Sequence, residues 1–260
     1  MNNQSEINKI SFSELKIWNE CPYKHKLYYF DNLKVFKGNE YTAFGTAMHY
    51  VCETLLPNNN VDAKQIFENK FNEELNNLEK FDEELISKMI AQAPKICEYI
   101  LPELKSRFGN FEIISIEEEL LEPVNDFSTK KPLNFKGFID LVIRTEDMRY
   151  HIIDWKTCSW GWDAKKRSDP MTVYQLTYYK NYFSNKHNID SEIIDTHFIL
   201  LKRTATKNLV EIVEVSSGPR RTKNSINLLE KAIKNMENNN FLKNRLSCKN
   251  CEFYKTEHCK

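Results

Sequence analysis

The sequence predicts an α/β protein in which a mixed central sheet is flanked by helices, with a helical N-terminal part and a cysteine-bearing C-terminal segment. Two observations predict this class. Apolar residues recur at helical spacing through most of the first 110 residues, whereas residues 111–216 contain short apolar runs typical of strands. The expected elements follow the order helices, three strands, helix, strands, helix, which is typical of a sheet with helices packed on its faces.

Local signals set the bounds of each element. Ser11 or Ser13 can cap a first helix, which ends around Pro22. A second helix over Thr42–Leu55 carries an apolar stripe and is stopped by Pro57. Further helices are expected over 62–80, 82–108, 170–185 and 219–238, with a break near Pro94 or Pro102. Strands are expected over 111–121, 133–144, 149–157, 196–203 and 209–215.

Composition is that of a single soluble domain over residues 1–260, of which 41% are hydrophobic. The 37 basic and 37 acidic residues argue against a protein that coats nucleic acid by charge alone. Residues 218–260 hold 10 basic and 4 acidic side chains, which fits either a surface facing a polyanion or a solvated helix face. No apolar run approaches the roughly 18 residues of a membrane span. The N-terminus, Met1 to Ile10, is polar and not a secretory signal, so we expect a cytoplasmic protein.

Two expected strands carry carboxylates and a lysine. Asp154 and Lys156 share one face of their strand because side chains alternate. If the turn of the hairpin centres on Asp147, residues whose numbers sum to 294 face each other, and Asp140 and Asp154 are such a pair. Opposed side chains have Cβ atoms about 4.5–5.5 Å apart, so the two carboxylates would repel without a cation between them.

A divalent cation such as Mg²⁺ or Mn²⁺ suits these oxygen ligands, and Lys156 would lie within reach of the same spot. Such a metal activates water and polarises a phosphoryl oxygen, which predicts phosphodiester hydrolysis. The alternative is a surface hairpin with an ordinary Asp–Lys ion pair. The apolar neighbours Ile152, Ile153 and Trp155 argue against it, because a buried carboxylate needs partners.

Four short motifs follow one another along almost the whole chain. They are a small-residue stretch before a histidine (Ala43 to His49), Gly-x-x-Asp (Gly137 to Asp140), Asp-x-Lys (Asp154 to Lys156) and Gln-x-x-x-Tyr (Gln175 to Tyr179). Each is weak alone, but the ordered set resembles the RecB-like branch of the PD-(D/E)XK nucleases. That branch includes the nuclease domains of RecB and AddB and the CRISPR-associated iron–sulfur exonucleases. The resemblance implies a restriction-endonuclease-like core.

The resemblance also implies roles. Four ligands would bind the divalent metal: His49, Asp140, Asp154 and the main-chain carbonyl of Trp155. Lys156 would act on the attacking water, and Gln175 and Tyr179 would position the substrate strand. Taken alone, His49 would be a satisfied core histidine paired with Glu53, and the other two would be ordinary helix residues. The helical region 42–110 would carry the histidine, and residues 111–216 would form the catalytic core.

Four of the seven cysteines are spaced for a metal site, namely Cys21 and, near the C-terminus, Cys248, Cys251 and Cys259. A four-cysteine zinc site fits this spacing. In the iron–sulfur relatives, one N-terminal and three C-terminal cysteines bind a 4Fe–4S cluster, so the resemblance favours a cluster. Residues 240–260 together with Cys21 would then form a structural staple between distant parts of the chain. The other three cysteines are expected to be small, unliganded hydrophobic residues: Cys52, Cys97 and Cys158.

Aromatic and basic residues follow the Asp-x-Lys motif and could contact single-stranded nucleic acid. They are Trp160, Trp162, Lys165, Lys166 and Arg167. The alternative is that both tryptophans cap the core. A weaker stretch of the same kind runs from Tyr23 to Lys26.

The sequence therefore predicts a metal-dependent deoxyribonuclease without a membrane anchor. We expect an exonuclease, or a structure-selective endonuclease, acting on DNA that is single-stranded or has free ends. The resemblance implies work in recombination, repair or phage-type DNA processing, with a helicase or recombination protein as the candidate partner. One alternative is a non-catalytic DNA-binding subunit of the same fold. Another is an iron–sulfur protein with a redox role, which would leave the carboxylate hairpin unexplained.

Overall fold

The structure, a computed structural model, describes residues 8–33, 38–58 and 60–260. Most of the polar N-terminal stretch, residues 1–7, therefore lies outside the described residues. The chain folds into two compact units. The first comprises Met1–Phe36, Glu119–Gly137 and Gly218–Lys260, and the second comprises Lys37–Glu118 and Phe138–Ser217. Strands β2 (Phe111–Pro123) and β3 (Asn134–Thr145) pair with each other and run from one unit into the other.

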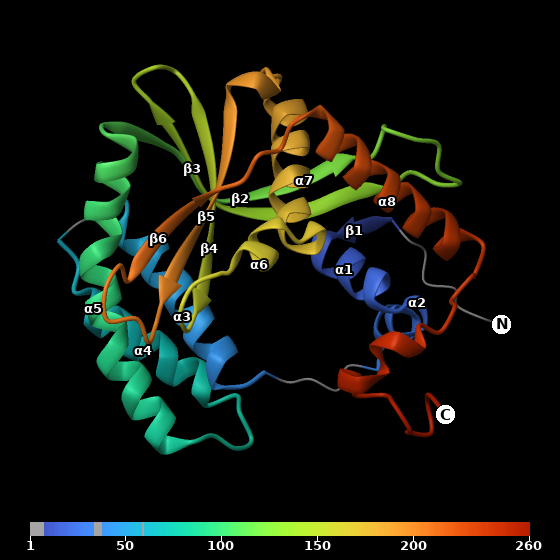
Figure 1. The fold of residues 1–260 in the computed structure, drawn as a ribbon, viewed down its shortest axis with the longest axis horizontal. Helices are drawn as coiled ribbons and strands as arrows, with labels where there is room; N and C mark the ends of the chain where they lie inside the picture. Colours follow the sequence, from blue (N-terminus) through green and yellow to red (C-terminus); the bar gives the residue numbers. More distant parts are fainter. Residues whose placement is uncertain (1–7, 34–37, 59) are drawn as a thin grey trace. The chain divides into compact units, whose positions relative to one another are not determined.

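The second unit is built from strands and the helices that cover them (Figure 1). Its helices are α3 (Glu40–Leu55), α4 (Ala63–Leu75), α5 (Glu83–Phe108), α6 (Ala164–Ser168) and α7 (Pro170–His187), with a short 3-10 turn at Ser191–Ile193. Its strands are β4 (Tyr150–Cys158), β5 (Ile194–Lys202) and β6 (Val210–Glu214), besides the first part of β2 and the second part of β3. Strand β4 is antiparallel to β3 and parallel to β5, and β5 is antiparallel to β6. The predicted fold class, a mixed sheet flanked by helices, is confirmed.

The two faces of this sheet meet different helices. Helices α3, α4 and α5 form a core with odd-numbered strand residues such as Ile153, Trp155 and Ile199. Helix α7 packs on the opposite face of β4 and β5, where the even-numbered residues of these two strands point. A buried hydroxyl network holds it there, because Ser217 Oγ lies 3.4 Å from Thr177 Oγ1 on α7 and 3.1 Å from Thr196 Oγ1 on β5.

The first unit joins parts of the chain that are far apart in sequence. It contains β1 (Lys9–Ser11), α1 (Phe12–Glu20), α2 (Pro22–His25), a π-helix (Lys26–Phe30), α8 (Pro219–Glu237) and a 3-10 helix (Arg245–Asn250). Strand β1 is parallel to the first residues of β3, and α1 packs against α8. Ser11 caps α1 through its hydroxyl, as predicted, but a second helix begins directly at Pro22. None of the helices in the described ranges is long and apolar enough to cross a membrane.

The predicted break in the third long helix is wrong. Helix α5 continues through both Pro94 and Pro102. Each proline removes a backbone hydrogen bond, but the helix keeps a buried stripe that includes Met89, Ile96 and Leu104. Burial of this stripe in the core of the second unit outweighs the local cost, since packing rather than propensity supplies most helical stability.

Strands β4 and β5 of the same unit carry a pair of buried histidines. His151 Nδ1 on β4 and His197 Nε2 on β5 are 3.1 Å apart, and His151 Nε2 is 3.1 Å from Thr145 Oγ1. The ring of Phe108 packs against both imidazoles. Burial, followed by the charge of His151 when it is protonated, lowers the pKa of His197 to about 3. The pair is therefore neutral in the folded protein near neutral pH.

Acid is expected to destabilise the protein through this pair. His197 has a folded pKa of about 3 against about 6.5 when unfolded, so between these values the unfolded chain binds more protons. The contribution of neutral His197 to the free energy of unfolding is therefore complete above about pH 6.5 and is lost as the pH falls. Urea unfolding should show a loss of about 2 kcal/mol between about pH 6.5 and 4.5, and His197→Gln should reduce this loss. The exposed His258→Gln is the control, and an unchanged pH profile in His197→Gln would contradict the prediction.

Candidate active site

Helix α3 carries His49 close to strand β4. The helix starts at a capping box in which the Asn39 side chain accepts from Thr42 N and Thr42 Oγ1 accepts from Asn39 N. A Cβ at Gly45 would lie only 3.3 Å from Thr157 Oγ1 on β4, so the helix approaches the strand as closely as a glycine permits. The small-residue stretch before His49 thus has a packing reason.

The β3–β4 hairpin has the predicted register. Leu141 pairs with Ile153 and Ile143 with His151, so paired numbers sum to 294 as expected. The β3–β4 ladder ends at Leu141 and Ile153, one position before Asp140 and Asp154. Beyond this pair, the Asp140 side chain makes the hydrogen bond to β4, because its Oδ2 accepts from Trp155 N at 2.7 Å. The hairpin therefore fixes the Asp140 carboxylate beside β4.

Three side chains from three elements converge next to this carboxylate. His49, Glu117 and Asp140 each offer one ligand atom, and these atoms all lie within 4.8 Å of one another. His49 Nδ1 lies 3.4 Å from Asp140 Oδ2. One imidazole nitrogen and two carboxylate oxygens form a donor set that suits Mg²⁺ or Mn²⁺. The sequence predicted two of these three residues as metal ligands.

Glu117 on β2 was missed because strand alternation fails around it. The inward positions of β2 are odd-numbered up to Ser115 and even-numbered from Ile116 onward. Glu117 itself has a φ of 51°, in the left-handed region that a non-glycine residue rarely adopts. Such a bulge re-aims a side chain, and strained residues of this kind cluster at functional sites. The run of three successive glutamates, Glu117 to Glu119, was the signal in the sequence.

The electrostatics of this group favour a cation. Burial, followed by the nearby charge of Asp154, raises the pKa of Asp140 well above its usual value. Partial burial, followed by the neighbouring Glu53 carboxyl, raises the pKa of Glu117 to about 7. Burial lowers the pKa of His49, which keeps the imidazole neutral and able to bind a metal. Glu53 thus faces Glu117, whereas the sequence left open a pairing with His49.

Asp154, Lys156, Gln175 and Tyr179 form a second group on β4 and α7. Asp154 is 1% exposed, and its Oδ1 accepts a 2.6 Å hydrogen bond from Gln175 Nε2, which also lies 3.1 Å from Tyr179 Oη. Asp154 Oδ2 is 2.5 Å from Lys156 Nζ but has no partner in hydrogen-bond geometry. The structure thus brings Asp154, Lys156, Gln175 and Tyr179 together. Asp140, the other predicted catalytic residue, lies in the group of His49 and Glu117.

Replacing Glu117 with glutamine is expected to weaken binding of Mn²⁺ by about 10- to 100-fold, because a charged oxygen ligand becomes a neutral one. Isothermal titration of the folded protein with Mn²⁺ measures this affinity. Glu119→Gln is the matched control, since Glu119 lies on the same strand and its carboxylate is 3.7 Å from Lys136. Equal affinities in the two variants would remove Glu117 from the ligand set.

The expected DNA-contacting residues divide into two sets. The ring of Trp162 packs on Phe198, with centroids 5.0 Å apart, so this tryptophan caps the core. Arg167 is held by Glu211, at 2.6 Å, and by the Trp162 carbonyl. Trp160 is 73% exposed. The two lysines, Lys165 and Lys166, lie on the exposed helix α6. Trp160 and Lys165 are therefore exposed, whereas Lys166 Nζ lies 5.7 Å from the centroid of the Trp162 ring.

In the basic stretch from Tyr23 to Lys26, in the first unit, two residues make structural contacts. His25 is fully buried and lies 2.8 Å from Glu14 Oε1. Lys24 forms ion pairs with Glu20 and Glu252. These residues anchor α2 rather than facing outward.

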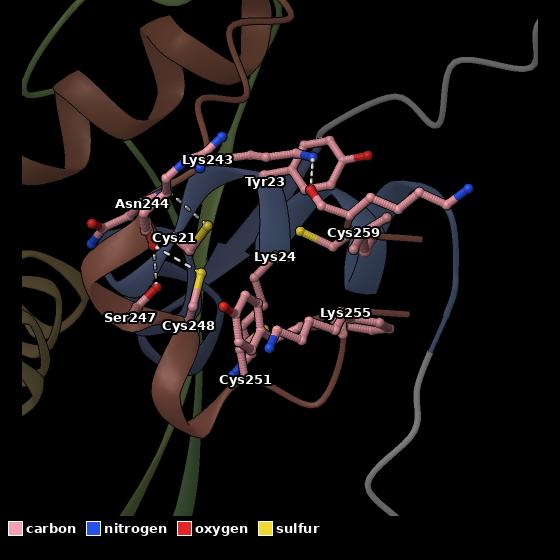
Figure 2. A pocket seen from close by; sticks show the side chains of 15 residues that line it. Cys21, Tyr23, Lys24, Lys243, Asn244, Ser247, Cys248, Cys251, Lys255 and Cys259 are labelled. Carbon is pink, nitrogen blue, oxygen red and sulfur yellow. Dashed lines mark hydrogen bonds between the residues drawn. The ribbon is translucent and has the colours of Figure 1, made fainter. Parts of the chain in front are cut away.

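The four predicted cysteine ligands surround one cavity of about 270 Å³ in the first unit (Figure 2). Figure 2 shows the sulfurs of Cys21, Cys248 and Cys259 turned toward the space between them. Asn244 N donates a 3.3 Å hydrogen bond to Cys21 Sγ. Five basic residues also line the cavity: Lys24, Lys243, Arg245, Lys255 and Lys260. Of the other cysteines, Cys52 and Cys97 are buried, as expected, and Cys158 is half-buried.

Comparison with known proteins places the chain in a family. A family model described as the PD-(D/E)XK nuclease superfamily matches residues 9–256. The chain is 13% identical to a crystal structure from Eubacterium rectale that is provisionally described as an exonuclease, with a TM-score of 0.58 over 94% of this chain and 86% of that one. It is 17% identical to SSO0001, with a TM-score of 0.45 over 96% and 86% of the two chains. No curated protein matches. Because the family model spans nearly the whole sequence, the chain belongs to the PD-(D/E)XK nuclease superfamily.

Proposed function

We propose that the chain is a divalent-metal-dependent deoxyribonuclease, and specifically an exonuclease that acts on DNA with single-stranded character or free ends. The observation that carries this proposal is the approach of His49, Glu117 and Asp140 to within 4.8 Å of one another. Members of the superfamily use divalent metals, and this donor set fits one. Recombination, repair or phage-type DNA processing is the context we propose.

The residues around this group have separate tasks. His49, Glu117 and Asp140 would hold Mg²⁺ or Mn²⁺. The resemblance to the RecB-like nucleases adds Asp154 and the Trp155 carbonyl as proposed further ligands. When bound, the metal would polarise the scissile phosphate and lower the pKa of a coordinated water.

Lys156 would orient the attacking water and stabilise the negative charge that develops on the phosphate. Gln175 would keep Asp154 in place through its 2.6 Å hydrogen bond. Attack of water on phosphorus breaks the P–O3′ bond and leaves a 5′-phosphate and a 3′-hydroxyl.

DNA is the substrate we infer, on the grounds of the superfamily and of the surface beside Lys156. The exposed Trp160 offers a stacking face, and Lys165 and Lys166 on α6 offer positive charge. A non-catalytic DNA-binding subunit would not need a lysine 2.5 Å from a buried aspartate beside a metal-binding group.

We also propose that the chain belongs to the RecB/AddB-like branch and that its four cysteines hold a 4Fe–4S cluster with a structural role. The cluster with its four thiolates is anionic, and basic residues around the cavity, namely Lys243, Arg245, Lys255 and Lys260, would balance that charge. The N–H of Asn244 directed at Cys21 Sγ is the kind of hydrogen bond that supports a thiolate ligand.

Zinc is the alternative occupant of these four cysteines, since four thiolates also form a structural zinc site. Metal and sulfide analysis of anaerobically purified protein separates the two, because zinc without sulfide would contradict the cluster.

The test of the nuclease proposal is digestion of end-labelled single- and double-stranded DNA by anaerobically purified protein with Mg²⁺ or Mn²⁺. We expect cleavage that a chelator stops and that added metal restores, and the label shows the polarity. If folded, metal-loaded protein binds DNA but cuts none of these substrates, the binding-subunit alternative replaces the enzyme.

A further inference from the structure

An exposed tyrosine lies on an arginine at the start of helix α3, in the second unit. Tyr41 is in the first turn of α3 and is 52% exposed. The guanidinium carbon of Arg203, which directly follows β5, lies 5.4 Å from the centroid of the tyrosine ring. One face of the ring is thus held by a cation, and much of the rest meets solvent. An aromatic ring fixed in this way is preorganised for stacking.

Arg203 is a nearly buried cation without an acidic partner. It is 9% exposed, and its Nη1 donates a 3.2 Å hydrogen bond to Gln92 Oε1. Among the described residues, none of the ion pairs includes Arg203, whereas its neighbour Lys202 is paired with Glu211 at 3.2 Å. Buried charges are normally neutralised, so an uncompensated guanidinium at a surface tyrosine indicates a site that attracts an anion.

A second exposed ring is attached to the same framework. Trp160 follows β4, the strand that carries Asp154 and Lys156, and is 73% exposed. Its loop is tied to the Arg203 segment, because Arg203 N donates to Cys158 O at 2.8 Å and Thr204 N donates to Ser159 O at 3.0 Å. These two hydrogen bonds hold the end of β4 and the start of the loop after it against the residues that follow β5.

We infer that Tyr41 and Trp160 are stacking platforms for the bases of a single-stranded nucleic acid and that Arg203 attracts its backbone. This inference rests on the proposed nuclease function and names the part of the substrate that the surface recognises. Tyr41 precedes His49 by eight residues on one helix, a distance of about 12 Å along the axis. A strand that enters the metal site can therefore reach the ring. Only unpaired bases expose their faces, so the surface selects single strands over intact duplex.

The test is fluorescence anisotropy with a labelled oligothymidylate and a blunt duplex, in Mg²⁺, with Lys156→Ala protein to prevent digestion. Adding Tyr41→Ala is expected to raise Kd for the single strand by about 5- to 100-fold and to leave Kd for the duplex within about twofold. Tyr41→Phe should bind like the parent, because it keeps the ring. Tyr99→Ala is the matched control, since Tyr99 lies on α5 of the same unit and is 46% exposed.

The outcomes separate this inference from the proposed function. If the wild type cuts DNA but Tyr41→Ala binds oligothymidylate as tightly as Tyr99→Ala does, the stacking surface is wrong and the nuclease stands. If Tyr41→Ala changes the oligomeric state in light scattering and not the DNA affinity, the surface serves a second copy of the chain instead. If the wild type neither binds nor cuts either DNA, the stacking surface and the proposed nuclease function are both wrong.

Discussion

Replacing Lys156 with alanine is expected to slow DNA cleavage by about 10²- to 10⁴-fold, the range for loss of a group that moves a proton or stabilises charge in the transition state. The Lys156 ammonium lies 2.5 Å from the buried Asp154 carboxylate and over the ring of Phe198. These contacts leave it little freedom, so its positive charge is already in place when substrate binds. Initial rates on end-labelled DNA under single-turnover conditions measure the change.

Loss of charge at Lys156 also acts on the carboxylates, and the experiment must separate the two effects. The ammonium lowers the pKa of Asp140 against burial and the charge of Asp154, so its removal favours the protonated acid. Titration with Mn²⁺ shows whether the metal still binds. Lys136→Ala is the matched control, since Lys136 on β3 has similar exposure and a carboxylate partner, Glu119 on β2. Cleavage by metal-loaded Lys156→Ala at the rate of Lys136→Ala would exclude the lysine from catalysis.

The hairpin that carries this lysine was predictable because a tight turn fixes strand register. Met148 N donates to Thr145 O and Thr145 N to Arg149 O, which centres the turn where the sequence placed it. Every pair up to Leu141 and Ile153 follows from that centre. The sequence could not show that backbone pairing ends at Leu141 and Ile153, or that the Asp140 side chain then bonds to Trp155 N. Both features depend on how the two strands diverge.

The sequence could not predict the contacts of residues whose position depends on a local irregularity of the backbone or on packing against distant parts of the chain. Glu117 comes to the metal group through a bulge, which periodicity does not anticipate. The spacing of Gln175 and Tyr179 showed a shared helix face, but not that Gln175 binds Asp154. The two tryptophans were equivalent in sequence, yet Trp162 packs on Phe198 and Trp160 does not pack into the core. Tertiary contacts decided each case.

Replacing Cys248 with serine is expected to destroy the proposed cluster and to destabilise the first unit by about 2–5 kcal/mol, the loss typical of removing a long-range covalent crosslink. The C-terminal segment 241–260 buries little apolar surface, and polar contacts such as the Lys24–Glu252 ion pair supply the rest of its attachment. Phe253 is its one buried residue, and Leu246 is 95% exposed. A segment with so small a core depends on a crosslink or a metal for its structure.

Cys158→Ser is the matched control for this variant, because Cys158 is half-buried like Cys248 but lies outside the cavity. Iron content, thermal unfolding and proteolysis of the C-terminal segment measure the two variants under anaerobic conditions. Cys248→Ser should lose iron and expose the segment to protease, whereas Cys158→Ser should behave as the wild type. Polar contacts such as Tyr23 N to Leu242 O, at 3.2 Å, would survive the substitution. If these contacts suffice, Cys248→Ser will match the control in stability, and the cavity would then have no structural role.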